Sequence, residues 1–365
     1  MSSGTSIINN NNVTPKEETV YAYLPNDIYC AVGRTIEIYD ELVCLNSYKY
    51  HIRWNCDIGH ALIGKYSVTG MVDFIGNHTL SFTVYDDDKT VLYEKNAVLH
   101  IVNAAVPSTT LATLGDSNSC GKFWQYEICG LSNDNIALVG ARSFHSTYNG
   151  KNKSIKVDGR GGFSTTRYLS GYPASVDYSD SGAESPHHAL YDPAAEKFSW
   201  KYYVDKSLNG ISPNNVIIML GTNELGKNID AFLADYKTIV DNIREDDPKI
   251  KILIAPCVFS GTQDGIGYQG NVEGYSKKRG AWQYDQDMAV WKQNKGLHDT
   301  FAGYDNLFFI ETAITMDRWH GYRTEQITVN PRSSEKIFIQ KESVHPTSVG
   351  YGQMADIIFS TLCGV

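Results

Sequence analysis

Three short polar stretches carry side chains that together could attack a carbonyl group. Residues 115–118 read Gly-Asp-Ser-Asn, residues 221–224 read Gly-Thr-Asn-Glu, and residues 342–346 read Glu-Ser-Val-His-Pro. A serine hydroxyl is a poor nucleophile unless a base takes its proton, and a neutral histidine can do this near neutral pH. Backbone N–H groups and an asparagine amide can stabilise the negative charge that then develops on the carbonyl oxygen. The stretches therefore predict covalent catalysis through Ser117, with His345 as the base.

Two of these stretches follow apolar runs that are typical of buried strands. Residues 111–114 (Leu-Ala-Thr-Leu) lead to Ser117, and residues 216–220 (Val-Ile-Ile-Met-Leu) lead to Asn223. Both side chains should therefore stand at the carboxyl ends of strands, where open α/β sheets place their ligands. His345 directly precedes an amphipathic segment, so a helix should hold it in place.

The elements that must position these residues change character near Pro107. Residues 19–106 alternate apolar and polar positions, from Tyr48 to Trp54 and again from Leu80 to Val84, between Gly-rich and Asp-rich turns, which predicts a small β-sandwich of immunoglobulin-like type. In residues 107–365 strands alternate with helices, which predicts a parallel sheet with helices on both faces. Residues 1–18 are polar and should form a flexible N-terminal arm.

Within the second part, apolar periodicity predicts one helix over residues 229–243 and another over residues 351–362. Insertions at about 168–205 and about 259–290 interrupt the alternation, and long loops at strand ends usually shape a substrate site. His187 and His188 lie in the first insertion without carboxylates at ligand spacing. We expect them to be solvated loop histidines, and we expect no metal and no cofactor.

Composition excludes several classes of protein. The chain has 365 residues and a net charge of −9, which argues against a general nucleic-acid binder. No apolar run is long enough to span a membrane, and the first residues lack the features of a secretory signal, so we expect a cytoplasmic or virion-associated protein. The seven cysteines are odd in number and form no Cys-x-x-Cys pair, which indicates reduced, mostly buried thiols.

In their order along the chain, these stretches resemble the blocks of the SGNH hydrolases, also called GDSL esterases and lipases, over roughly residues 108–363. The resemblance includes a further block at residues 158–164 (Asp-Gly-Arg-Gly-Gly-Phe-Ser). It implies a three-layer α/β/α, flavodoxin-like domain with a serine nucleophile at Ser117. The implied oxyanion donors are the backbone of Ser117, the backbone of Gly162, for which Gly161 is a near competitor, and the side chain of Asn223.

The chain departs from the family pattern at two acidic positions. The family's Asp after the Gly-x-Asn block is here Glu224, and the Asp three positions before the histidine is here Glu342. Glu342 could orient His345 and complete a triad, or a backbone carbonyl could hold the imidazole and leave a Ser-His dyad. Asp116 should bond backbone amides of its own turn rather than act as a second base.

The resemblance also implies an activity. A β-sandwich joined to such a domain resembles carbohydrate esterases that remove O-acetyl groups, so the implied substrate is an acetylated carbohydrate or another small ester. Residues 329–332, 344–347 and 350–356 resemble a subgroup found in gut bacteria and their phages. The alternatives are a non-catalytic glycan-binding or virion attachment protein, and a thioesterase or lysophospholipase. We expect no nucleic-acid or membrane partner, and an oligomer is possible.

Two structural alternatives stay open at single residues. Asn223 could merely cap the helix that follows it. His345 could be an ordinary residue in the first turn of the last helix.

Overall fold

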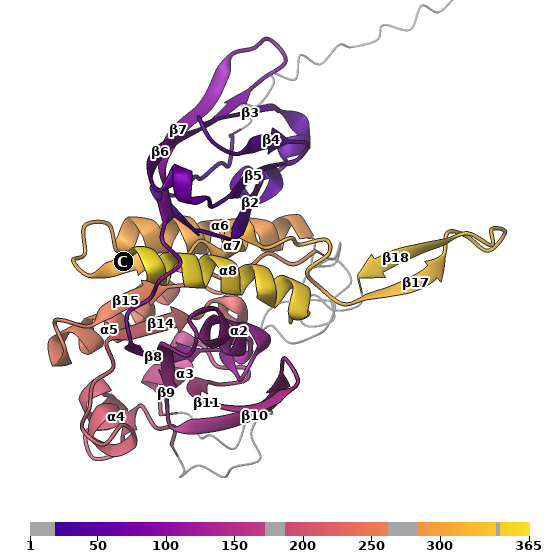
Figure 1. Ribbon diagram of the computed structural model, residues 1–365. Helices are drawn as coiled ribbons and strands as arrows, with labels where there is room; N and C mark the ends of the chain where they lie inside the picture. Colours follow the sequence, from indigo (N-terminus) through magenta and orange to yellow (C-terminus); the bar gives the residue numbers. More distant parts are fainter. Residues whose placement is uncertain (1–18, 172–186, 262–282, 341–343) are drawn as a thin grey trace, which may run out of the picture.

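The computed structural model describes residues 19–171, 187–261, 283–340 and 344–365. The first part of the chain forms a small β structure, which lies beside the helices that cover one face of a larger sheet (Figure 1). The arm expected at residues 1–18 lies outside the described residues, as does the centre of each expected insertion.

Two sheets form the β-sandwich that the sequence predicts. The larger sheet has the order β1 (Asp27–Ala31), β7 (Val91–Val102), β6 (Gly76–Tyr85), β3 (His51–Asn55), and the smaller has the order β2 (Thr35–Tyr39), β5 (Lys65–Thr69), β4 (His60–Leu62). The alternation at Leu80, Phe82 and Val84 buries all three side chains in the core. The strand expected to begin at Tyr48 begins later. Tyr48 is exposed in a 3₁₀ turn, η1 (Ser47–Lys49), before β3 begins. Two more short elements, α1 (Asp40–Val43) and η2 (Val72–Phe74), complete this part.

The second part is built on a parallel sheet of flavodoxin-like order. β8 (Thr109–Gly115), β14 (Asn215–Met219), β15 (Lys251–Ile254) and β16 (Leu307–Phe309) pair in parallel. On the other side of β8, β9 (Ile136–Val139) pairs along its first half and β11 (Lys151–Gly159) pairs at its end, while β10 (Arg142–Tyr148) adds an antiparallel edge. Across the sheet the strands lie in the order β9, β8, β14, β15, β16. The chain adds β9 on one side of β8 and then adds β14, β15 and β16 on the other side, so the order of connection reverses between β8 and β14. Ligands bind at such a reversal in open α/β sheets.

Helices cover both faces of this sheet, because both faces of its strands are apolar. Leu111 and Ile217 pack with the helices α2 (Phe123–Leu131) and α8 (Ser348–Gly364) on one face. Ala112 and Val216 pack with α3 (Thr165–Leu169), α4 (Trp200–Ser207) and α5 (Ile229–Asp246) on the other. Continuous apolar strands of this kind are typical of parallel sheets that are buried on both sides. The three-layer α/β/α prediction is thus confirmed.

The sandwich and the α/β part share one apolar core. Residues of β1 and β6 belong to the same buried cluster as α8 and the α8-facing side of β8. The Ala31 N–H in β1 donates to the Ser360 hydroxyl in α8 at 2.9 Å. Farther along the contact, the Tyr21 ring meets the Trp291 ring edge-on in α6 (Gln283–Thr300). The sandwich is therefore packed against the α/β part rather than tethered beside it.

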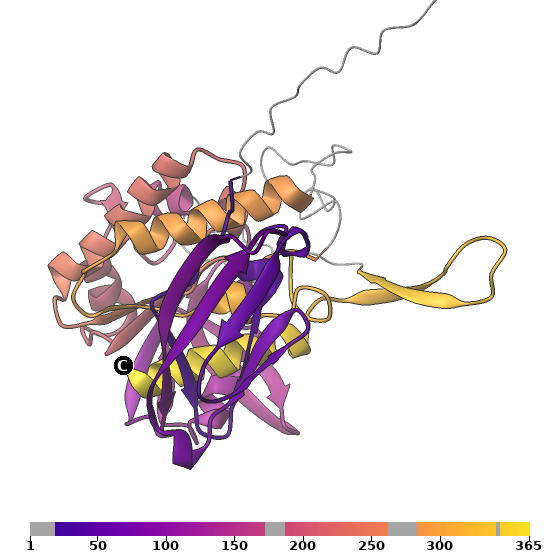
Figure 2. The same ribbon diagram turned by 90° about the horizontal axis from the view of Figure 1, so that it is seen from above.

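A hairpin projects from the body between α7 (Thr312–Thr315) and the segment that carries His345, as Figures 1 and 2 both show. Its strands are β17 (Thr324–Thr328) and β18 (Lys336–Gln340), and the sequence did not predict it. Residues 329–332 lie in its turn, where the Val329 N–H donates to the Glu335 carbonyl at 3.0 Å. The remaining short pair, β12 (Tyr191–Asp192) and β13 (Lys197–Phe198), precedes α4.

Two further observations concern composition. Five of the seven cysteines are buried, in agreement with the expectation of mostly buried thiols. Within the described part of the chain, no helix has the length and apolarity that crossing a membrane requires.

Candidate active site

Ser117 and His345 meet at the carboxyl end of the parallel sheet. Ser117 begins the 3₁₀ turn η3 (Ser117–Ser119) directly after β8, and His345 lies three residues before α8. The two residues are 228 positions apart in the chain, yet His345 Nε2 lies 2.9 Å from Ser117 Oγ. This is the distance at which an imidazole can take the proton of a hydroxyl. The structure thus brings the predicted nucleophile and base together, while their catalytic roles stay predictions.

The turn that carries Ser117 is held from three sides. The Asp116 carboxylate accepts the Asn118 N–H at 2.8 Å, which confirms the expectation that Asp116 bonds its own turn. The Asn118 side chain accepts the Tyr351 hydroxyl of α8 at 2.9 Å, and the Asn118 carbonyl accepts the Trp124 indole N–H of α2 at 2.8 Å. These contacts bind η3 to both helices of one layer, so the Ser117 backbone is positioned by the folded core.

Gly115 lets the end of β8 lie against β14. A Cβ atom at this position would lie 2.6 Å from the Met219 carbonyl oxygen and 2.4 Å from the Ser119 hydroxyl oxygen. Such distances are far below van der Waals contact, so a side chain at residue 115 would displace the Ser117 turn.

The second block forms a tight turn at the end of β11. The Phe163 N–H donates to the Arg160 carbonyl at 3.1 Å, and Gly162 in the third position has φ of +71°. Glycine is favoured there because side chains rarely tolerate positive φ. Arg167 Nη1 donates to the Gly162 carbonyl. The hydrogen bond that closes the turn uses the Phe163 N–H and not the Gly162 N–H. The predicted role of Gly162 as an oxyanion donor requires this.

Asn223 links the third block to this turn. It lies in η5 (Thr222–Glu224) directly after β14, and its Nδ2 donates to the Phe163 carbonyl at 2.8 Å. An amide nitrogen carries two hydrogens, so one is left for an oxyanion. Asn223 is not the cap of α5, because Asn228 fills that position and accepts the Ala231 N–H at 3.1 Å.

His345 is likewise not an ordinary residue in the first turn of α8. Thr347 caps this helix and accepts the Val349 N–H. The imidazole is therefore placed before the helix.

Glu224 is the functional candidate that sequence reasoning left without a role. Its side chain is buried and accepts the Thr165 N–H at the start of α3. Asn223 and Glu224 are neighbours in the chain, and each forms a hydrogen bond with the loop that carries Gly162. The two loops with predicted oxyanion donors are therefore joined by two adjacent hydrogen bonds. The family's Asp at this position was the available signal, but the partner across the fold was not visible in the sequence.

Burial raises the pKa values of two carboxyl groups near these loops. Desolvation raises the pKa of Glu224 to about 7, against the opposing hydrogen bonds from Thr165. Desolvation also raises the pKa of Asp116 to about 6, against the hydrogen bonds from Asn118 and Thr222. Around neutral pH, Glu224 and Asp116 together therefore carry less negative charge than two carboxylates with ordinary pKa values would.

Glu342 lies outside the described residues. The structure accordingly leaves both the triad with Glu342 and the Ser-His dyad as predictions.

A buried ion pair lies directly behind the glycine turn, and the sequence did not reveal it. Asp158 and Arg160 are both fully buried, with Asp158 Oδ1 3.3 Å from Arg160 Nη2. The other oxygen of Asp158 accepts the Tyr203 hydroxyl and, at 3.0 Å, the Ala141 N–H. Since a buried charge must be paired and hydrogen-bonded to be tolerated, this network ties the turn to the layer of α4.

The expectation of solvated histidines is wrong for His188. Its side chain is buried, Nε2 lies 3.0 Å from the Tyr168 carbonyl, and the ring contacts Phe163 edge-on. Burial, reinforced by the nearby Arg160 charge, lowers the pKa of His188 to about 3, so the imidazole is neutral at ordinary pH. Among the described residues, no three histidine, cysteine, aspartate or glutamate side chains gather as metal ligands would.

No family model and no curated protein matches the sequence. Solved structures with a similar fold include a carbohydrate esterase family 3 from Talaromyces cellulolyticus, with 14% identity, a TM-score of 0.43, and coverage of 70% of this chain and 96% of that chain. A family two carbohydrate esterase from Clostridium thermocellum in complex with cellohexaose has 13% identity and a TM-score of 0.38, over 91% of this chain and 92% of that one. A carbohydrate esterase family 2 enzyme plus carbohydrate binding domain from Corynascus thermopiles has 13% identity and a TM-score of 0.36, over 92% of each chain.

Proposed function

We propose that this protein is a serine ester hydrolase that works through an acyl-enzyme. The observation that carries the proposal is the 2.9 Å contact between Ser117 Oγ and His345 Nε2 at the reversal point of a parallel sheet. The order of the blocks along the chain, which resembles that of the SGNH hydrolases, supports the same conclusion.

In the proposed reaction, His345 Nε2 takes the Ser117 proton as the oxygen attacks the ester carbonyl. The tetrahedral oxyanion is held by the N–H groups of Ser117 and Gly162 and by the second amide hydrogen of Asn223. The protonated imidazole then gives its proton to the leaving alcohol, and an acyl-Ser117 ester forms. Water, deprotonated by His345, attacks this ester, releases the acid and restores Ser117.

The proposed substrate class is O-acetylated carbohydrate. The support for it is the resemblance of the two-part layout to carbohydrate esterases. Virion association of the protein stays a prediction.

Turnover of 4-nitrophenyl acetate, butyrate and octanoate by the wild type, Ser117→Ala and Ser119→Ala tests the proposal. Ser119 is a matched control, since its buried hydroxyl lies in the same turn. We expect acetate-selective turnover that Ser117→Ala abolishes and Ser119→Ala retains, together with acetate release from an acetylated polysaccharide. Preference for octanoate would favour a lysophospholipase or thioesterase instead. Glycan binding without turnover of any ester would identify a non-catalytic binding protein.

The role of Glu342 has its own test. Loss of the orienting carboxylate in a triad costs up to about 10,000-fold in kcat. A decrease of that size in Glu342→Ala would indicate a triad, whereas a decrease of less than about tenfold would indicate a dyad.

A further inference from the structure

The loop Asp317–Tyr322 connects the β-sandwich to the segment that carries His345. It follows α7 and leads into the projecting hairpin. Its downstream end contacts the residues directly after His345: the Thr347 N–H donates to the Gly321 carbonyl at 2.7 Å, the Thr347 hydroxyl donates to the same oxygen at 3.1 Å, and Tyr322 forms a bridge with Pro346. The backbone on one side of His345 is therefore fixed by this loop.

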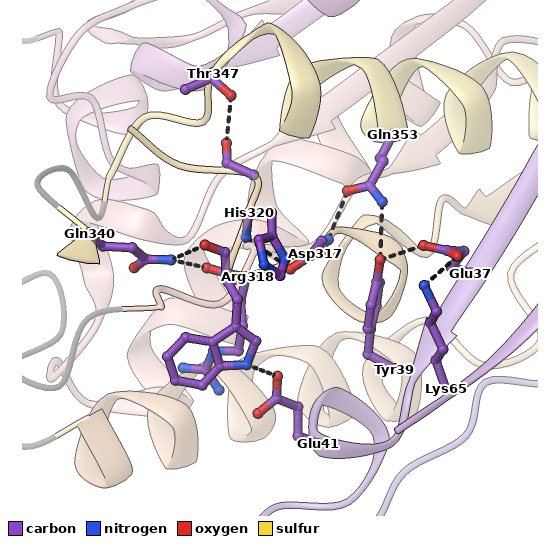
Figure 3. Close-up of polar contacts among 12 residues, drawn as sticks. Glu37, Tyr39, Glu41, Lys65, Asp317, Arg318, His320, Gln340, Thr347 and Gln353 are labelled. Carbon is purple, nitrogen blue, oxygen red and sulfur yellow. Dashed lines mark hydrogen bonds and ion pairs between the residues drawn. The ribbon is translucent and has the colours of Figure 1, made fainter. Parts of the chain in front are cut away.

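The upstream end of the loop is held by the sandwich, partly through α8. The Asp317 N–H donates to Gln353 Oε1 of α8 at 2.8 Å, and Gln353 Nε2 donates to the Tyr39 hydroxyl of β2 at 3.1 Å (Figure 3). Tyr39 is buried and donates in turn to Glu37 at 2.7 Å, which also pairs with Lys65 at 2.5 Å. The sandwich thus supplies a fixed acceptor at the end of a short chain of bonds.

A second contact from the sandwich reaches the middle of the loop. The Trp319 indole N–H donates to Glu41 Oε1 at 2.5 Å (Figure 3). The ring is half-exposed, and Arg318 lies over it at 5.7 Å. Glu41 thus fixes the direction of a side chain that solvent alone would leave mobile.

The loop has its own internal and lateral supports. The Asp317 carboxylate accepts the N–H groups of Trp319 and His320 at 2.8 and 3.0 Å. Arg318 pairs with Asp287 of α6 at 2.7 Å and donates to the Ser260 carbonyl. The Gly321 N–H donates to the Asp317 carbonyl at 2.9 Å, so the end of the loop that meets α8 and the end that meets Thr347 are joined directly.

We propose that the sandwich residues Tyr39 and Glu41 are positioning residues for His345, acting through the loop Asp317–Tyr322. The proposal rests on the proposed function, because it assigns these residues a role in placing the base of that reaction. A misplacement of about 1 Å in a catalytic group can cost about 100-fold in rate, so contacts this remote can matter for kcat. In this proposal the β-sandwich helps to position the catalytic base, a role that requires no sugar binding.

Tyr39→Phe, Glu41→Met and the double variant test this proposal. Arg34→Met is the matched control, because Arg34 also joins the sandwich to α8, through a 3.3 Å contact with Asp356, but forms no hydrogen bond or ion pair with the loop Asp317–Tyr322 among the described residues. The measurements are kcat and KM on 4-nitrophenyl acetate, the rate at which a fluorophosphonate labels Ser117, and the melting temperature. Tyr39→Phe removes one hydroxyl and keeps the ring, so its core packing should survive.

We expect each single variant to lower kcat about 3- to 10-fold, the factor that one neutral hydrogen bond can supply, with KM changed less than about twofold. The labelling rate should fall in parallel with kcat. The double variant should lose about 10- to 100-fold. Arg34→Met should match the variants in melting temperature but keep the wild-type kcat.

The inference is overturned if kcat and labelling of the double variant stay within about twofold of Arg34→Met. It is also overturned if all interface variants lose rate only in proportion to lost stability, since that pattern indicates a general structural role. Failure of the wild type to hydrolyse any ester or react with the fluorophosphonate would instead remove the proposed function, and this inference with it.

Discussion

Replacing Asn223 by alanine should slow the proposed reaction far more than it weakens substrate binding. The amide Nδ2 contacts the Phe163 carbonyl at 2.8 Å with one hydrogen, and the other is proposed to stabilise the oxyanion. Loss of one such donor costs about 100- to 1,000-fold in kcat, or about 2.7–4 kcal/mol. The same change also removes the Asn223 hydrogen bond to the Phe163 carbonyl next to Gly162, so the second donor loses a support. We therefore expect a loss near the upper end, about 1,000-fold.

Steady-state kinetics on 4-nitrophenyl acetate measure this loss, with KM expected to change less than about threefold. Asn228→Ala is the control, because it removes an asparagine five positions away that caps α5. It should cost about 1 kcal/mol of stability and leave kcat unchanged. A loss in Asn223→Ala below about tenfold in kcat, or a change confined to KM, would refute the assignment of Asn223 as an oxyanion donor.

Three further predictions concern stability. The pKa of Glu224 is raised from 4.5 to about 7 in the fold, so its contribution to stability is fully present below pH 4.5 and is lost as the pH rises through about 7. The melting temperature of Glu224→Gln should therefore fall less with pH over this range than that of the wild type. An equal pH dependence of the two melting temperatures would contradict the burial argument. Gly115→Ala should lower the free energy of unfolding in urea by more than about 2 kcal/mol. Gly352→Ala in α8, where a Cβ meets no atom within 4 Å, should raise it by about 0.5–1 kcal/mol. If Gly352→Ala proved the more destabilising of the two, the close approach at Gly115 would be unimportant. Arg160→Met should cost about 3–5 kcal/mol, because it leaves the Asp158 carboxylate buried without its ion pair, and a loss under about 1 kcal/mol would show that Tyr203 and Ala141 suffice.

Local patterns predicted the secondary structure best where periodicity was long and uninterrupted. The apolar stripe predicted over 229–243 lies within α5, and the stripe at the end of the chain is α8. The hairpin of β17 and β18 escaped prediction, since its strands are short and largely exposed, so burial imposes no clear alternation on them. Tyr48 misled for a related reason, because an alternating pattern of aromatic residues does not show where a strand begins.

For the site, the sequence by itself determined the order of the blocks, the identities of Ser117, Gly162, Asn223 and His345, and the strands that precede the first and third blocks. Those features depend on neighbours in the chain, whose types can be read directly. Only the tertiary structure decided that His188 is buried, that Glu224 reaches Thr165, and that the sandwich contacts the loop beside His345. Each of these depends on a partner between 20 and 278 positions away in the chain. The packing of buried surfaces, which no local pattern encodes, selects that partner.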